Sequence, residues 1–222
     1  PRLWNSTDWT LYDTITIDAT QVDDDLTDFP VYIDLADLSA RFWATTPSGS
    51  ATVGTDIRVT TNDGSPVELA RELVSASSTA QTGELHFKAN TISSTTNTVF
   101  RIYYNGSTVG DYATDATYGA QNVWSNGYLS VLHLGDGDST AADFYLDSTS
   151  NNKDGTLVDA NADSVQTSGK LGSGMDFVTN NSDFIRVDGL NIANTDLTLS
   201  GWVYPDDTPA THDGYFGFRE DT

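Results

Sequence analysis

The sequence has no cysteine among its 222 residues. Disulfide bridges, thiol catalysis and thiolate metal ligands are therefore excluded. There is no run of about 18 apolar residues, so we predict no membrane insertion. The opening sequence PRLWN leads directly into polar residues, so we expect no secretory signal in it. Apolar residues keep no helical period beyond two turns, which favours strands.

Basic residues are also scarce. Lys and Arg together number 10 against 32 Asp and Glu, which gives a formal net charge of −22. Such a surface repels phosphate groups, so nucleic acid is excluded as a partner. High salt or bound Ca²⁺ would relieve the self-repulsion of so many acids. The composition therefore favours a halophilic or marine setting, although Asp is also a common turn residue.

Recognisable catalytic motifs are missing as well. The three histidines form no HExxH pair, and no GxSxG sequence occurs. Glu68 and Glu72 would lie about 13 Å apart along a strand, beyond the roughly 5–9.5 Å that separates the carboxyl groups of glycosidases. The glycine-rich stretch 169–177 lacks the earlier glycine of a phosphate-binding loop. We therefore expect no enzymatic activity and a structural or rim position for His133.

What the sequence does contain is a series of short apolar segments. In the segment 29–35 the apolar residues occupy alternate positions from Phe29 to Leu35, as in a strand with one buried face. Similar patterns, separated by polar turns about ten residues apart, predict an antiparallel sandwich or jelly roll. The predicted strands of this series are 11–18, 29–35, 56–61, 66–74, 84–89 and 98–106.

The same part of the chain resembles a known family. The matching pieces are Trp9 with 15–17, LTDFPVYIDL at 26–35, GTDIRV at 54–59 and RIYYNG at 101–106. Together they are similar to a small uncharacterised β-domain family that precedes laminin-G-like domains in surface and viral proteins. The resemblance covers residues 9–106. It implies a role in attachment or spacing and no enzymatic activity.

A second resemblance lies further along the chain. It rests on VWSNGYLSVLHL at 123–134, GKLGSGMDF at 169–177 and LTLSGWVYP at 197–205. This ordered set resembles the entry to the concanavalin A-like, laminin-G-type β-sandwich, a fold used mainly to hold glycans. It implies that the stretch 169–177 leads into a core strand in which Met175 and Phe177 pack inward. The residues themselves predict strands at 128–134, 183–189 and 197–205.

We therefore predict an all-β protein with two antiparallel β-sandwich (jelly-roll) domains. Residues 1–106 form the attachment or spacer domain, and residues 107–121, which are rich in small and polar side chains, form a linker. Residues 122–222 form a concanavalin A-like domain that we expect to be truncated, because they are too few for two full sheets. The alternative is one large domain in which 107–121 is an ordered loop.

Two acidic loops in the second domain are candidates for a Ca²⁺ site. Hard cations need six to eight oxygen ligands, which closely spaced Asp and Asn side chains are able to supply. The spacing lacks the final Glu of an EF-hand loop, and ordinary turns use the same residues. The candidate ligands are Asp136, Asp138, Asp147, Asn152 and Asp154.

Trp202 and Tyr204 share one face of the predicted strand 197–205. If exposed, these aromatic rings would suit the apolar face of a sugar. They are therefore the candidate glycan-binding residues. The alternative is that they belong to the core, which is the commoner position for such side chains.

These observations favour a non-enzymatic structural and adhesion module of a virion appendage, such as a tail fibre, spike or capsid turret. Its expected location is the virion surface, where it would contact host-surface glycans and other virion proteins. Appendages of this kind are symmetric assemblies, so we expect a homo-oligomer, with a trimer as the first expectation. The alternatives are an extracellular or cell-surface adhesin of a prokaryote, or a polysaccharide-active enzyme.

Overall fold

The computed structural model describes residues 6–45, 53–106, 110–158, 163–177, 183–190, 192, 196–205 and 216–217. Within these ranges the only α-helix is the short α1 (Ala40–Thr45). None of the helices described has the length and apolarity needed to cross a membrane. All paired strands run antiparallel, which confirms the predicted all-β class. Single 3₁₀ turns occur at Ser6–Asp8, Ala19–Gln21, Leu35–Asp37 and Ala120–Asn122.

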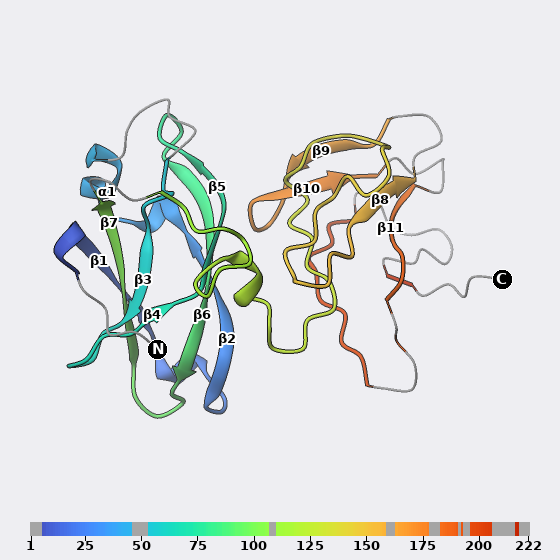
Figure 1. Ribbon diagram of the computed structural model, residues 1–222. Coiled ribbons are helices and arrows are strands. Elements are labelled where there is room, and N and C mark those ends of the chain that lie inside the picture. The colour runs from blue at the N-terminus through green and yellow to red at the C-terminus, as the bar shows by residue number, and fades with distance from the viewer. Residues whose placement is uncertain are drawn as a thin grey trace.

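The first unit, residues 6–106, consists of two antiparallel sheets that lie face to face (Figure 1). Because a strand presents alternate side chains to opposite faces, each sheet is able to bury one face against the other. One sheet has the order β1 (Trp9–Ile17), β7 (Thr98–Gly106), β3 (Arg58–Thr61) and β4 (Glu68–Leu69). The other has the order β2 (Leu26–Asp34), β6 (Thr82–Ile92) and β5 (Arg71–Ser77).

The core of the first unit lies between these two sheets. Ile102 from β7 and Leu85 from β6 are fully buried in one continuous apolar cluster. The rings of Phe87 and Phe100 meet edge to face across the layers, with centroids 4.9 Å apart. Aromatic pairs in this geometry add to the free energy gained by burial. The contact between inner faces makes the first unit a β-sandwich.

The segment 110–122 packs against this sandwich. The guanidinium of Arg71 lies 2.7 Å from the carboxylate of Asp111, and Arg71 itself is 2% exposed. The hydroxyl of Tyr112 donates to Oε1 of Glu68 over 2.8 Å. The described part of the predicted linker is therefore held by polar contacts to the first unit. Residues 107–109 lie outside the described ranges.

The second unit begins at Val123 and contains two small sheets, shown in yellow and orange in Figure 1. Each sheet has two strands, so each strand pairs its backbone groups with a neighbour along one edge only. The first sheet pairs β8 (Gly155–Val158) with β11 (Phe184–Val187), and the second pairs β9 (Val165–Ser168) with β10 (Ser173–Asp176).

Two strands predicted for the second unit are absent from its described residues. In 128–134 the backbone forms a single bridge, between Leu132 and Asp147, and Leu134 adopts a positive φ of 57° that ends the extended run. The residues 197–205 form no regular secondary structure. The predictions of strands there are therefore wrong.

The other predictions for the second unit are partly confirmed. β11 lies within the predicted strand 183–189, and β10 lies within the glycine-rich stretch 169–177. Met175 is half-buried, and its sulfur accepts a hydrogen bond from the hydroxyl of Tyr145 over 3.6 Å. Phe177 is 39% exposed, so the prediction that it packs inward is wrong. It lies just beyond the end of β10, where no strand of the described residues covers it.

Candidate functional site

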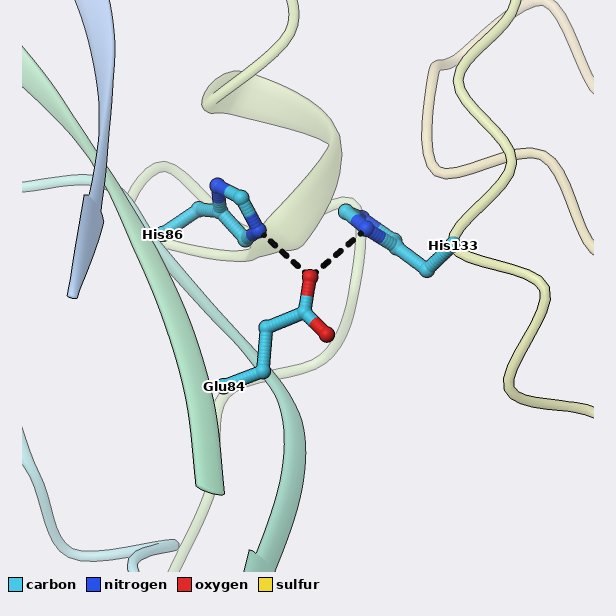
Figure 2. A group of neighbouring side chains, drawn as sticks. All are labelled: Glu84, His86 and His133. Carbon is cyan, nitrogen blue, oxygen red and sulfur yellow. Dashed lines mark hydrogen bonds and ion pairs between the residues drawn. The ribbon is translucent and has the colours of Figure 1, made fainter. Parts of the chain in front are cut away.

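Polar side chains from both units meet where the second unit contacts β5 and β6 of the first. We call this group the His133 cluster, after the residue that contacts both of its carboxylates. Figure 2 shows three of its members, with the carboxylate of Glu84 between the rings of His86 and His133. The cluster consists of Glu72, Glu84, His86, Trp124, His133 and Ser148.

The pairing of β5 with β6 explains how the first unit contributes its side chains. Residues two apart on a strand share a face, so Glu84 and His86 point to the same side of β6. Leu85 and Phe87 are fully buried in the sandwich core on the other side. Glu72 is the cross-strand partner of His86. The outer face of this sheet therefore presents two carboxylates and one imidazole to the second unit.

The imidazole of His133 lies between the two carboxylates. Its Nε2 is 3.1 Å from Oε2 of Glu72, and its Nδ1 is 3.2 Å from Oε1 of Glu84. Both ring nitrogens therefore face acceptors, which requires a proton on each nitrogen. The side chains of all three residues are at most 13% exposed. The contact is a buried ion triad between the units.

The remaining acceptor positions of the carboxylates are also used. Glu72 accepts hydrogen bonds from the indole Nε1 of Trp124 and the hydroxyl of Ser148, each over 2.6 Å. Oε1 of Glu84 accepts from Nε2 of His86 over 2.8 Å. Short bonds to a charged acceptor are among the strongest hydrogen bonds in proteins. They offset much of the cost of burying two carboxylates.

The pKa values in the cluster follow from these contacts. Burial lowers the pKa of His133, but its hydrogen bonds to Glu72 and Glu84 and their negative charges outweigh this effect and raise the pKa to about 9. Burial raises the pKa of Glu84, but hydrogen bonds from His133 and His86 and their charges lower it to about 2. The pKa of Glu72 is lowered for the same reason, with His133 as its largest stabilising partner. At neutral pH the triad therefore carries one positive and two negative charges.

Apolar and glycine residues close the space around the cluster. The ring of Trp124 lies 5.2 Å from that of His86 and 5.7 Å from that of His133, measured between centroids. Val123, the residue before Trp124, is fully buried and belongs to the same apolar cluster as Ala70 and Trp124. Gly172 adopts a φ of 54°, and a Cβ atom at this position would overlap Oε2 of Glu84. The glycine-rich stretch thus approaches the carboxylate through backbone atoms alone.

This arrangement suits a structural contact or a metal site better than general-base catalysis. A fully paired imidazolium with a pKa near 9 is not a general base poised for neutral pH, where the ideal pKa lies near the operating pH. A buried ion triad does, however, fix the relative position of the elements that carry it. The imidazole nitrogens and carboxylate oxygens of the cluster are also ligand atoms for divalent transition metals.

Glu68, which the sequence singles out together with Glu72, has a different partner. It lies on β4, where its carboxylate is 3.5 Å from the guanidinium of Arg58. Arg58 is 1% exposed and covers the ring of Tyr112 at 4.2 Å. Glu68 and Glu72 therefore stabilise separate contacts.

Among the predicted Ca²⁺ ligands, Asp147 is the most deeply buried, at 8% exposure. Its Oδ1 accepts from the backbone N–H groups of Val131 and Thr149, each over 2.9 Å. Its Oδ2 accepts from the hydroxyl of Thr149 over 2.7 Å and from the N–H of Lys153 over 2.8 Å. The carboxylate therefore organises the loop through four hydrogen bonds.

The other four predicted ligands also form hydrogen bonds with nearby residues of the same chain. Asp154 accepts from the N–H of Asp147 over 2.7 Å, and Asp136 accepts from the N–H of Leu146 over 3.3 Å. Asp138 accepts from the N–H of Gln166. The amide of Asn152 lies 3.5 Å from the carbonyl of Ser150. In the described part of the chain, the group of His and acidic residues close enough to share one ion is instead Glu84, His86 and His133.

The candidate glycan-binding residues are strongly exposed. Trp202 is 72% exposed and Tyr204 is 88% exposed, whereas the alternative interpretation places them in the core. That alternative is wrong for the described structure. Val203, between them, is 45% exposed. The two rings therefore offer apolar surface to solvent on a segment without regular secondary structure.

The sequence does not reveal the His133 cluster as a group. It brings Glu72 to notice only beside Glu68, and His133 only as a single polar residue on a predicted strand. One local signal was present, since Glu84 and His86 alternate with Leu85 and Phe87 and must share a face of their strand. Buried charged and polar groups need hydrogen-bond or ion-pair partners. A glutamate and a histidine on one face of a predicted strand therefore indicate that another segment packs there and supplies such partners.

Comparisons of the chain with protein-family models, with curated protein sequences and with solved structures find no match.

Proposed function

We propose that the protein is a non-enzymatic structural and adhesion module of a virion appendage, and that its second unit contacts host-surface glycans. The observation that carries this proposal is the exposure of Trp202 and Tyr204, at 72% and 88%. Such rings lose unfavourable contact with water when the apolar face of a sugar stacks on them. The role requires no catalytic group.

The charge of the protein supports a neutral sugar as the partner. With a net charge of −22, the surface repels phosphates and other polyanions. Stacking of an uncharged pyranose on aromatic rings needs no positive side chain. The proposal includes Ca²⁺, bound by the acidic loops of the second unit, as an aid to sugar binding. Its ligands would be Asp136, Asp138, Asp147, Asn152 and Asp154.

The His133 cluster supports a structural role for the first unit. Because the ion triad joins the units, the second unit is held in a defined position relative to the sandwich. A receptor-binding surface gains affinity when it is preorganised in this way. In the proposal the sandwich attaches to other virion proteins and assembles as a homo-oligomer, with a trimer as the first expectation.

The test is binding to a glycan array and to whole cells, with Ca²⁺ and with chelator. We expect Trp202→Ala and Tyr204→Ala each to weaken binding at least tenfold. Phe29→Ala, which removes an aromatic ring that is 42% exposed on the first unit, is the matched control and should leave binding unchanged. Binding that survives the loss of both rings would overturn the assignment of this site.

Two further readouts separate the alternatives. Release of reducing sugar from a bound polysaccharide would identify the protein as an enzyme and overturn the non-enzymatic role. Antibody labelling of purified virions and of prokaryotic cells would distinguish a virion component from a cell-surface adhesin. Absence of glycan and cell binding by the unmodified protein would leave attachment and spacing as its role.

A further inference from the structure

We propose that Glu84, His86 and His133 form a binding site for a divalent transition-metal ion of the zinc class, at the contact between the two units. This site is independent of the glycan contact proposed above, because it uses buried side chains of both units. It would make the metal a link between segments that are far apart in the sequence.

The donor atoms are already close together. Oε1 of Glu84 lies 2.8 Å from Nε2 of His86 and 3.2 Å from Nδ1 of His133, and all three ligand atoms lie within 4.8 Å of one another. Tetrahedral Zn²⁺ with bonds of about 2.0–2.2 Å places its ligand atoms about 3.3–3.6 Å apart. Small rotations of these side chains are therefore sufficient to receive the ion. Figure 2 shows both rings directed toward the same carboxylate oxygen.

Glu72 supplies the hydrogen-bond acceptor that the second ring nitrogen of a metal-bound histidine usually has. A histidine that binds a metal through one ring nitrogen donates the other N–H to a carboxylate or carbonyl, which fixes its tautomer and its orientation. His133 would bind through Nδ1, and its Nε2 already lies 3.1 Å from Oε2 of Glu72. Trp124 and Ser148 hold that carboxylate in place with two further hydrogen bonds.

Charge balance also favours a divalent cation. Glu72 and Glu84 place two carboxylates beside His133, and their side chains are 11% and 5% exposed. A divalent cation bound at Glu84, His86 and His133 would add positive charge close to both carboxylates. Buried charges are stable when they are paired or bound to metal, so this position suits a cation.

The type of donor selects the metal class. Imidazole nitrogen suits Zn²⁺, Co²⁺, Ni²⁺ and Cu²⁺, whereas Ca²⁺ and Mg²⁺ take oxygen ligands. Three protein ligands leave a fourth position for a water molecule or the second oxygen of Glu84. The proposal therefore predicts that Zn²⁺ binds and that Ca²⁺ does not compete for this site.

The experiment is a titration of the chelator-stripped protein with Zn²⁺ in competition with a chromophoric chelator, followed by Co²⁺ absorption spectroscopy. We expect one Zn²⁺ per chain, a visible Co²⁺ band typical of tetrahedral coordination, and no displacement by excess Ca²⁺. His86→Gln should weaken Zn²⁺ binding at least tenfold. Glu72→Gln, which keeps all three ligands, should weaken it about 10- to 100-fold.

Asp24→Asn is the control, because it removes one negative charge from an exposed position of the first unit. Its Zn²⁺ affinity should equal that of the unmodified protein. If the histidine variant does not fold, NMR of the unmodified protein replaces it, and Zn²⁺ should shift the imidazole signals of both His86 and His133. Absence of stoichiometric binding, or binding that leaves these two signals unchanged, would overturn the proposal.

Discussion

Nε2 of His133 lies 3.1 Å from Oε2 of Glu72, and this contact joins two units whose participating residues are 61 positions apart in the chain. Both side chains are largely buried, at 13% and 11% exposure. The bond is part of a triad that also includes Glu84. The stability of the contact between the units therefore depends on the positive charge of one imidazole.

Replacement of that imidazole should be costly. His133→Ala leaves the carboxylates of Glu72 and Glu84 buried without their shared cation, and the loss of one partner from a buried ion pair costs about 3–5 kcal/mol. We expect a decrease of this size in the free energy of unfolding, measured by urea denaturation at pH 6.

An exposed ion pair provides the matched control. The guanidinium of Arg186 lies 2.9 Å from the carboxylate of Asp188, and these side chains are 51% and 60% exposed. Surface pairs of this kind contribute about 0–1 kcal/mol. Arg186→Ala should therefore change the free energy of unfolding much less than His133→Ala. Equal effects of the two variants would contradict the importance of the buried triad.

The triad also predicts how stability depends on pH in the metal-free protein. The pKa of His133 is raised from 6.5 to about 9, so its stabilisation is fully present below pH 6.5 and is lost as the pH rises through about 9. The pKa of Glu84 is lowered from 4.5 to about 2, so its stabilisation is present above pH 4.5 and is lost as the pH falls through about 2. The contact should be most stable between these limits, from about pH 4.5 to 6.5.

Urea denaturation across this pH range, with chelator present, measures the effect. The informative quantity is the difference in the free energy of unfolding between the unmodified protein and His133→Ala at each pH. We expect it to be largest in the window from about pH 4.5 to 6.5 and to fall toward alkaline pH. A difference that stays constant from pH 5 to pH 10 would show that His133 does not carry the charge assigned to it.

Most strands of the first unit were predictable because burial of one face leaves an alternating pattern in the local sequence. The prediction of one strand at 66–74 is wrong, because this segment is divided between β4 and β5, which belong to different sheets. The predicted segment 98–106 is identical to β7, and the predicted segment 29–35 overlaps most of β2. In β7, Phe100, Ile102 and Tyr104 face the space between the sheets, and in β2 Val31 and Ile33 do so. Phe29 is 42% exposed, so the predicted buried face of 29–35 does not extend to it. The order of strands within the sheets does not follow from this pattern, since it depends on contacts distant in the sequence.

The second unit shows where the same reasoning fails. The segments 128–134 and 197–205 have the composition of strands, but a strand also needs a neighbouring backbone with which to pair. In 128–134 the N–H of Val131 instead donates to the side chain of Asp147. A side-chain acceptor of this kind competes with sheet pairing, and composition alone does not reveal it.

The candidate site was not predictable as a set, because its members come from β5, β6 and the segment that begins at Trp124. Only the pairing of Glu84 with His86 along one strand face was visible in the sequence. The position of Glu72 beside them depends on the register of β5 against β6. The position of His133 depends on how the second unit packs against that sheet, which no local pattern records.

Gly172 offers a test of the close approach between the glycine-rich stretch and Glu84. Its φ of 54° is unfavourable for other residues, and a Cβ atom would overlap Oε2 of Glu84. Gly172→Ala should therefore lower the free energy of unfolding by about 1–3 kcal/mol. Gly64→Ala is the control, because a Cβ atom there meets nothing within 4 Å and the backbone is unstrained. If the two variants are equally stable in thermal and urea denaturation, the stretch does not pack on Glu84.

Asp147 distinguishes a loop ordered by hydrogen bonds from a loop ordered by Ca²⁺. Its Oδ2 accepts from the hydroxyl of Thr149 and the N–H of Lys153, and an amide in its place retains only one oxygen. Asp147→Asn should cost about 1–3 kcal/mol, because a buried donor loses its partner. If hydrogen bonds alone order the loop, urea denaturation will give the same cost in chelator and in millimolar Ca²⁺. A cost that appears only with Ca²⁺ would instead identify Asp147 as a ligand of the predicted calcium site, since a bound ion stabilises only the protein that is able to hold it.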